Sequence, residues 1–300
     1  MHGTLRSVTA ACCASLGLAL LIGVFLRSSP DRAAAEPEAL EIAIAGLGSS
    51  LALGAFALAG ALAQRGRLRD NLGLGRSSEE LSPWRIAALI VGFVGCSHLV
   101  DLGLSLTPLY DMSALGILER GLRGARGATL ALAVVGIAIG PGLCEELLFR
   151  GLLLRGLVRR WGAGAAILST SFLFGALHLD PIQGPAAFVL GLYLGAAALA
   201  SGGTRVPILC HIANNLVALA AAVAGLEALS ARGAVTLALA SGVAALLGMG
   251  VLRRATPEGM PMETPFLQPT RQRAEIACST RAPEEDSNER NSDSTAGRRR

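Results

Sequence analysis

Residues 127–157 read GATLALAVVGIAIGPGLCEELLFRGLLLRGL, and this stretch decides the fold class. It is apolar over more than the roughly 20 helical residues that cross the hydrocarbon core of a bilayer. Its middle is interrupted only by two adjacent carboxylates, Glu145 and Glu146, and by Arg150. The stretch therefore predicts a membrane-spanning helix that carries ionisable groups inside the membrane, where such groups are expensive and usually functional.

The composition of the whole chain supports this prediction. Hydrophobic residues make up 52% and charged residues only 16%, whereas about a quarter of the residues of a soluble domain are charged. These values exclude a disordered chain and a typical soluble enzyme. Further apolar runs lie at 7–26, 42–63, 86–107, 163–178, 184–201, 206–226 and 231–252. We therefore predict an all-α fold, a polytopic membrane helical bundle with about eight transmembrane helices. Ser7–Leu26 could instead be a signal peptide, but its length favours a retained span.

The loop charges predict the orientation of the chain. All basic residues are arginine, and they are dense in 64–85 and around 150–160, while the loop 27–41 is mostly acidic. By the positive-inside rule, both chain ends are cytoplasmic. The loop 108–126 disagrees, because it should lie outside and yet holds three arginines. Either it lies along the interface as an amphipathic helix, or the span count is wrong by one there.

Three parts of the chain differ in character. Residues 1–126 hold N-terminal transmembrane helices and loops, 127–252 form a core with the polar motifs, and 253–300 hold nine arginines and eight acids with little apolar pattern. This last part predicts a disordered cytoplasmic tail. The arginines lie in loops and not on one face, which speaks against a nucleic-acid partner. The cysteines show no CxxC spacing, so we expect neither a disulfide framework nor a cysteine zinc site.

The two glutamates of the quoted stretch differ in what they can do. Gly140-Pro141-Gly142 is expected to break the helix, which would place both glutamates in the first turn of a new helical piece, where carboxylates are stabilised. Glu146 and Arg150 are four residues apart, with the acid N-terminal, as in a favourable helical ion pair. Glu145 points about 100° away from Glu146. We therefore expect Glu146 to be held by the arginine and Glu145 to be free for chemistry.

Two later spans carry polar pairs with the same spacing of four. Phe174 and His178 share one face of a helix, as do His211 and Asn215, and Asn214 on the adjacent flank is a weaker candidate. At about 1.5 Å per residue, these groups and Glu145 can meet in the cytoplasmic half or the middle of the bilayer. A carboxylate, two histidines and an asparagine inside a membrane suggest hydrolysis in a water-filled cavity.

A further polar pair lies in an earlier span. His98 and Asp101 are three residues apart and share one face. We expect a hydrogen bond between them that offsets the cost of their burial; contact with a substrate is the alternative.

In this order, EExxxR, FxxxH and HxxxN resemble the motifs of the CPBP family, over about residues 127–226. This CAAX-protease and bacteriocin-processing group of intramembrane proteases includes the Rce-type CAAX endopeptidases. The resemblance implies that Glu145 and His178 activate water, a role that needs a general base. It further implies that Glu146 with Arg150 supports the catalytic residues and that His211 with Asn215 stabilises the oxyanion.

The resemblance also sets the expected substrate and cofactor. It implies a membrane-associated protein or peptide, cleaved near its C-terminus within the lipid bilayer. The arginine-only, Ala- and Gly-rich composition indicates a high-GC bacterium and its inner membrane, which favours bacteriocin-like peptides or sorting signals, as the related myxosortases process, over prenylated CAAX proteins. We expect no cofactor: zinc could bind Glu145, His178 and His211, but a metal-free glutamate mechanism is favoured. The rival functions are a non-catalytic scaffold or chaperone and a proton-coupled transporter that uses Asp101 and the two glutamates.

Overall fold

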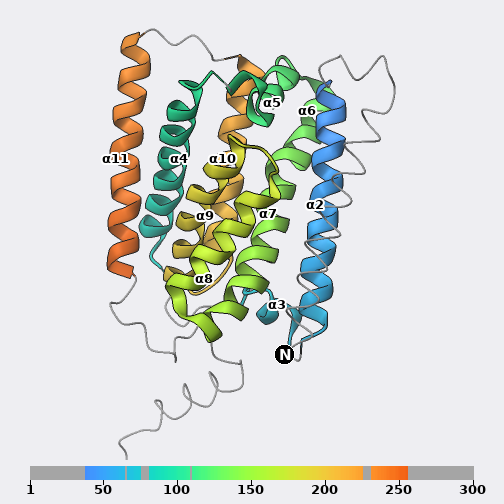
Figure 1. The fold of residues 1–300 in the computed structure, drawn as a ribbon, viewed down its shortest axis with the longest axis vertical. Helices are drawn as coiled ribbons and strands as arrows, with labels where there is room; N and C mark the ends of the chain where they lie inside the picture. Colours follow the sequence, from blue (N-terminus) through green and yellow to red (C-terminus); the bar gives the residue numbers. More distant parts are fainter. Residues whose placement is uncertain (1–37, 65, 76–80, 109, 226–230, 256–300) are drawn as a thin grey trace, which may run out of the picture. The chain divides into compact units, whose positions relative to one another are not determined.

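The computed structural model describes residues 38–64, 66–75, 81–108, 110–225 and 231–255. These residues contain helices and no strand, and six helical stretches are long and apolar enough to cross a membrane. They comprise α2 (Ala39–Leu62), α4 (Pro83–Ser105), α9 (Gln183–Ala200), α10 (Arg205–Ala224), α11 (Ala231–Ala255) and a long run from Gly127 to Leu177 (Figure 1). The predicted all-α membrane bundle is confirmed.

The six helical stretches correspond to seven predicted spans, because the long run contains two of them. Its backbone leaves the helical region at Gly162, where φ is 79° and ψ is 170°. Leu154 and Leu157, before this point, pack against Ala166 after it. The chain therefore reverses direction at Gly162, and the predicted spans 127–157 and 163–178 lie side by side. The predicted span 7–26 lies outside the described residues, as does the predicted tail from residue 256 onward.

The two predicted membrane parts of the chain pack together. From the first part, α2 contacts α7 (Gly140–Glu146) and α4 contacts α9, α10 and α11. Residues 1–126 and 127–252 are thus not separated in space where the structure describes them, and their division stays a prediction about where the motifs lie.

Short helices lie at the two ends of the bundle. α3 (Leu68–Asn71) lies at one end, and α5 (Ala114–Leu122) lies at the other (Figure 1). The loop 108–126 is therefore not a span, and the helix α5 within it supports the first of the two predicted alternatives. Ser113 caps the N-terminus of α5, since its side chain accepts a hydrogen bond from the Gly116 amide, and the helix buries Leu122 against α2 and α10.

The sequence around Pro141 does not break the helix, contrary to our prediction. The long run passes through α6 (Gly127–Ala133), a π-helical segment η2 (Val134–Ile139), α7, a second π-helical segment η3 (Leu147–Leu154) and α8 (Arg155–Leu177). Pro141 lies in the first turn of α7, directly after the wider π-helical turn, which gives its ring room. Glu145 and Glu146 therefore end α7, and no free helix N-terminus faces their carboxylates.

Glycines allow the helices that carry the polar motifs to approach closely. A Cβ atom on Gly142 would lie 2.9 Å from the backbone nitrogen of Ile212, so α7 and α10 touch almost backbone to backbone. Gly191 and Gly195 of α9 face α8 with the same effect, and a Cβ on Gly191 would lie 3.1 Å from the Ser171 Cβ. Gly191 and Gly195 are four residues apart on α9, and such a pair of small residues allows two helices to pack closely.

Candidate active site

The polar centre of the bundle is a buried network in which the carboxylate of Glu146 contacts a guanidinium, Arg150, and an imidazole, His211. Oε1 of Glu146 accepts hydrogen bonds from Nη1 of Arg150 at 2.8 Å and from Nδ1 of His211 at 2.9 Å. The side chains of Glu146 and Arg150 are completely buried. Because an ionised carboxylate can only accept, Nδ1 of His211 carries a proton, and the other ring nitrogen, Nε2, is available for another partner. The predicted Glu146–Arg150 pair is thus confirmed, with His211 as a third member.

Arg150 is held from two further sides. Its Nη2 donates to the backbone carbonyl of Gly191 at 3.0 Å, and its Cζ lies 4.7 Å from the ring centroid of Phe174. A buried charge is tolerated only when it is paired and hydrogen-bonded. The contact with Gly191 was not predicted, since its only signal in the sequence is the small residue that brings α9 close.

Phe174 packs against both histidines. Its ring centroid lies 5.2 Å from that of His178 and 5.9 Å from that of His211, in edge-to-face arrangements. On its other side it contacts Phe149, at 5.2 Å. The phenylalanine of the FxxxH motif therefore fixes the positions of the two imidazole rings relative to each other.

His178 follows the last residue of α8 and is half-buried. Its Nδ1 lies 2.9 Å from the backbone carbonyl of Phe174. A carbonyl accepts and cannot donate, so Nδ1 carries the proton, and Nε2 of the neutral ring has a free lone pair. This is the form of histidine that can accept a proton or orient a water molecule.

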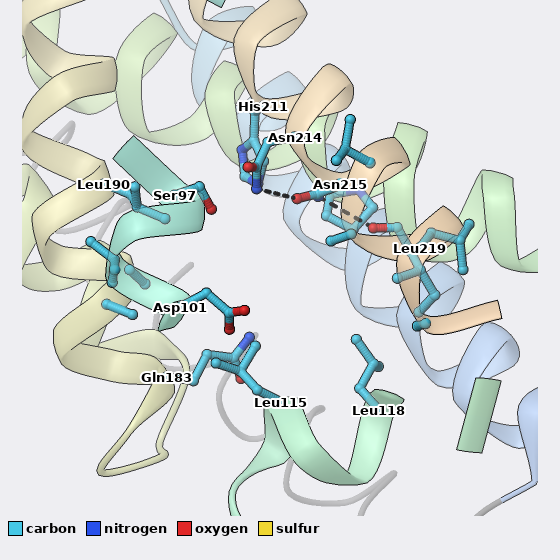
Figure 2. A pocket seen from close by; sticks show the side chains of 18 of the residues that line it. Ser97, Asp101, Leu115, Leu118, Gln183, Leu190, His211, Asn214, Asn215 and Leu219 are labelled. Carbon is cyan, nitrogen blue, oxygen red and sulfur yellow. Dashed lines mark hydrogen bonds between the residues drawn. The ribbon is translucent and has the colours of Figure 1, made fainter. Parts of the chain in front are cut away.

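A cavity of about 450 Å³ brings the predicted groups together. Its lining includes the side chains predicted for chemistry, namely Glu145, His178, His211, Asn214 and Asn215. Figure 2 shows the three of them on α10 at one side of the cavity, with Asp101 and the α5 residues Leu115 and Leu118 across from them. Glu145 lies about midway between Gly127 and Gly162, so the groups meet near the middle of the helices, and the cavity extends from there toward the α5 end.

The two glutamates have different surroundings, as the helix geometry predicted. Glu146 and Arg150 are not part of the cavity wall, whereas Glu145 is. Glu145 is half-buried and has no hydrogen bond or ion pair with any described residue. One carboxylate is thus fixed in the protein interior, and its neighbour is exposed to whatever enters the cavity.

Asn215 is anchored by its own amide. Its Nδ2 donates to the backbone carbonyl of Ile137 at 3.3 Å, while its Oδ1 accepts a long hydrogen bond of 3.5 Å from Asn214. An amide nitrogen has two hydrogens, so Asn215 keeps a second N–H that can be donated to another group.

The predicted hydrogen bond between His98 and Asp101 does not form. Both residues line the cavity, but Oδ1 of Asp101 accepts instead from the Tyr110 hydroxyl at 3.0 Å. The chain after α4 folds back into the short helix η1 (Tyr110–Met112), which brings this hydroxyl within reach of the aspartate. Burial raises the pKa of Tyr110, and the Asp101 carboxylate raises it further. The phenol therefore stays a hydrogen-bond donor.

A second carboxylate that was not predicted lines the same part of the cavity. Glu119 of α5 is partly buried there, and burial, with the nearby Asp101 in second place, raises its pKa although Arg123 and Arg120 act in the opposite direction. No spacing in the sequence connects Glu119 with Asp101, because α5 reaches the cavity only through the fold.

The ligand set considered for zinc is not assembled. Among the described residues, no three His, Cys, Asp or Glu side chains are grouped closely enough to hold a metal ion. The geometry thus does not support a zinc ion held jointly by Glu145, His178 and His211, and the metal-free mechanism stays a prediction. The cysteines that the structure describes, Cys96, Cys144 and Cys210, are free.

A model of a known protein family matches the part of the chain that carries the polar motifs. Residues 127–217 match the model of the type II CAAX prenyl endopeptidase Rce1-like family. This match supports a CAAX protease of the CPBP family. The Rce1-like segment begins at the first residue of α6 and contains all six residues predicted to be catalytic. It indicates an intramembrane endopeptidase of the CAAX type in general, and a hydrolase in the membrane. No match was found among curated proteins or among solved structures.

The Rce1-like segment also shows what lies outside the family motifs. Four polar residues that line the same cavity as Glu145 and His178 precede this segment: His98, Asp101, Tyr110 and Glu119. One side of the cavity thus carries the family motifs, and the other side is built from α4, η1 and α5.

Proposed function

We propose that this protein is an intramembrane endopeptidase that hydrolyses a peptide bond near the C-terminus of a membrane-associated protein or peptide. The observation that carries the proposal is the division of labour between adjacent glutamates: Glu146 is buried in an ion pair, and Glu145 is unpaired in a cavity with two histidines. A structural ion pair accounts for Glu146 and Arg150 and leaves Glu145 without a role.

The reaction follows from the positions of these groups. Glu145 takes a proton from a water molecule that Nε2 of His178 orients, and the resulting hydroxide adds to the carbonyl carbon of the scissile bond. Glu145 then returns the proton to the leaving nitrogen as the C–N bond breaks, which yields a carboxylic acid and an amine. No covalent intermediate with the protein is required.

The developing oxyanion needs donors on the opposite side. Asn215 has its second N–H for this purpose, and His211, when protonated on both nitrogens beside the Glu146 carboxylate, has its Nε2–H. Removal of one such donor typically costs about 100- to 1,000-fold in rate. Glu146 and Arg150 act through His211, which they hold in place.

We further propose that the protein lies in the inner membrane of a bacterium, with both chain ends and the arginine-rich end of the bundle on the cytoplasmic side. Arg67 and Arg69 lie at α3, and Arg155, which precedes the reversal at Gly162, donates from Nη1 to the backbone carbonyl of Asp70 in α3. These arginines therefore share one end of the bundle, and α5 lies at the opposite end (Figure 1). The cavity then extends toward the outer face, and we propose bacteriocin-like peptides or sorting signals as substrates in preference to a prenylated cytoplasmic protein.

Cysteine labelling tests this orientation. In a variant without its native cysteines, a cysteine at the exposed position of Met112 should react with a membrane-impermeant maleimide in intact cells, and one at Trp161 only after permeabilisation. The reverse pattern would refute the orientation and leave the catalytic proposal untouched.

The proteolytic activity is tested by incubating the purified protein with a bacterial membrane proteome and mapping new C-termini. Glu145→Ala and His178→Ala should abolish the cleavages while the unfolding temperature stays unchanged, and Asp111→Asn, an exposed carboxylate outside the cavity, should retain them. Full cleavage by either alanine variant would overturn the mechanism. Failure of the wild type to produce any new C-terminus would favour the scaffold or transporter instead. A chelator that inactivates the enzyme, with recovery on addition of zinc, would overturn the metal-free mechanism.

A further inference from the structure

Asp180 lies between α8 and α9, outside every motif, and its carboxylate joins three backbone amides. Oδ1 accepts from the amides of Ile182 at 2.8 Å and Gln183 at 2.6 Å, at the start of α9. Oδ2 accepts from the amide of Ala114 at 2.8 Å, at the start of α5. Burial alone would raise the pKa of Asp180, but these backbone hydrogen bonds outweigh it, so its pKa is lowered and the side chain is ionised.

The turn that Asp180 holds carries His178. Leu179, between the two residues, has a φ of 50°, in the left-handed region that a leucine enters only at a cost. Such a conformation persists only where the surroundings enforce it. The hydrogen bonds of Oδ1 close the turn directly after this residue, so they fix where α8 ends and where the imidazole of His178 lies.

The other oxygen of Asp180 holds the opposite wall of the cavity. Ala114 is the first residue of α5, and the next turns of α5 supply Leu115, Leu118 and Glu119 to the cavity. Figure 2 shows Leu115 and Leu118 across the cavity from His211. The position of this wall therefore depends on a contact only two residues away from His178 in the sequence.

We propose that Asp180 is a positioning residue of the endopeptidase: its carboxylate couples the turn that carries His178 to α5, so that the catalytic imidazole and the substrate-facing wall are held in one geometry. The catalytic part of this inference rests on the proposed function. The coupling itself is a contact that can be measured without any substrate.

Two substitutions break the contact between Asp180 and α5 from its two sides. In Asp180→Asn, the remaining carbonyl oxygen can cap α9, which turns the amide nitrogen toward the Ala114 N–H and loses that bond. In Ala114→Pro the N–H itself is removed. Proline is well tolerated at the first position of a helix, Ser113 before it already has an extended backbone, and Ala114 is exposed, so that its ring has room. Asp180→Ala, by contrast, removes both halves of the contact, and the exposed Asp111→Asn is the matched control.

Hydrogen exchange tests the coupling without a substrate. In Asp180→Asn and Ala114→Pro the amides of α5 should exchange about tenfold faster than in the wild type, since hydrogen bonds to charged groups contribute strongly. The double variant should show no further increase, and Asp111→Asn should exchange at the wild-type rate. Unchanged exchange in both single variants would overturn the coupling.

Cleavage of a mapped substrate peptide tests the positioning role. Ala114→Pro and Asp180→Asn should raise KM about tenfold and leave kcat within about threefold, because only the wall is released. Asp180→Ala should also lower kcat at least tenfold, because the turn at His178 is freed, and the unfolding temperature should stay within a few degrees. Faster exchange without any change in KM or kcat would refute the positioning role. If the wild type cleaves nothing, the proposed function fails, and hydrogen exchange alone decides whether the coupling exists.

Discussion

Arg150 and Glu146 can be replaced separately and together, and the structure sets what each replacement costs. Arg150→Met leaves the Glu146 carboxylate completely buried without its cationic partner and removes the donor to the Gly191 carbonyl. Breaking a buried pair from one side typically costs about 3–5 kcal/mol. Glu146→Leu leaves the guanidinium buried instead and takes the acceptor from His211. We expect a loss of the same size for this variant.

The double variant shows how much of the loss in each single variant comes from leaving one buried charge without its partner. With both charges replaced by apolar side chains, no buried charge is left, and such exchanges are often close to neutral. The residual cost is that of the unpaired Gly191 carbonyl and His211 Nδ1, about 1–3 kcal/mol for each group at most. From the middle of these ranges, the two single variants added together cost about 8 kcal/mol and the double variant about 4 kcal/mol, so we expect the double variant to be less destabilised than the sum by about 4 kcal/mol.

The measurement is the free energy of unfolding in lipid bicelles, with proteolysis assayed on the same preparations. Arg159→Met is the control, because Arg159 is exposed and, among the described residues, makes a single long hydrogen bond, to its own helix, so its effect should stay within about 0.5 kcal/mol. The double variant should be folded but inactive, since His211 has lost its partner. If the losses in the free energy of unfolding of the two single variants add up to that of the double variant, the two charges do not stabilise the fold as a pair. An active double variant would remove Glu146 from the mechanism.

Three further substitutions test the helix contact at the glutamates and the polar part of the cavity wall. Gly142→Ala should push α7 away from Ile212 and lower the unfolding temperature and the activity together, since the added Cβ meets backbone atoms; wild-type behaviour of this variant would contradict the close approach. Glu119→Gln should leave the unfolding temperature at pH 7 unchanged or higher. A raised carboxyl pKa means that ionisation of Glu119 in the folded state is unfavourable above that pKa. A clearly lower unfolding temperature of this variant would show that the ionised form stabilises the fold. Tyr110→Phe should have the opposite effect and cost about 1 kcal/mol, because Asp101 loses its only hydrogen-bond donor among the described residues, and an unchanged free energy of unfolding would mean that water replaces the phenol.

The parts of the site that were predictable follow from short-range geometry. Glu146 with Arg150, Phe174 with His178 and the pair on α10 are all four residues apart, and a spacing of four places two side chains on one face wherever the chain is helical. Long apolar runs predicted where those helices lie. The predicted break at Pro141 failed because it depended on how a proline is accommodated, and the π-helical turn in front of it is not visible in the pattern of apolar residues.

Contacts made by the backbone could not be predicted in this way. The Gly191 carbonyl accepts from Arg150, and the Ala114 amide donates to Asp180, 66 residues further along the chain. Every residue has a carbonyl and nearly every residue an amide, so no residue type marks the partner. The same holds for Asp101, which was paired with the nearest polar side chain on its own helix, whereas the fold brings Tyr110 from the next element.

This difference bears on where specificity can lie in such an enzyme. The groups proposed for chemistry lie on α7, directly after α8 and on α10, within the Rce1-like segment, and their arrangement depends on spacings that a sequence motif can encode. The wall of the cavity that faces them comes largely from α4 and α5, outside that segment, and depends on contacts that no motif encodes. A change in α5 or in its link to Asp180 would therefore alter which peptide fits while Glu145 and His178 keep their positions. The substrate of this protein should accordingly be sought by exchanging α5 residues such as Leu118 and measuring which cleavages change, since exchanging motif residues can only switch the reaction off.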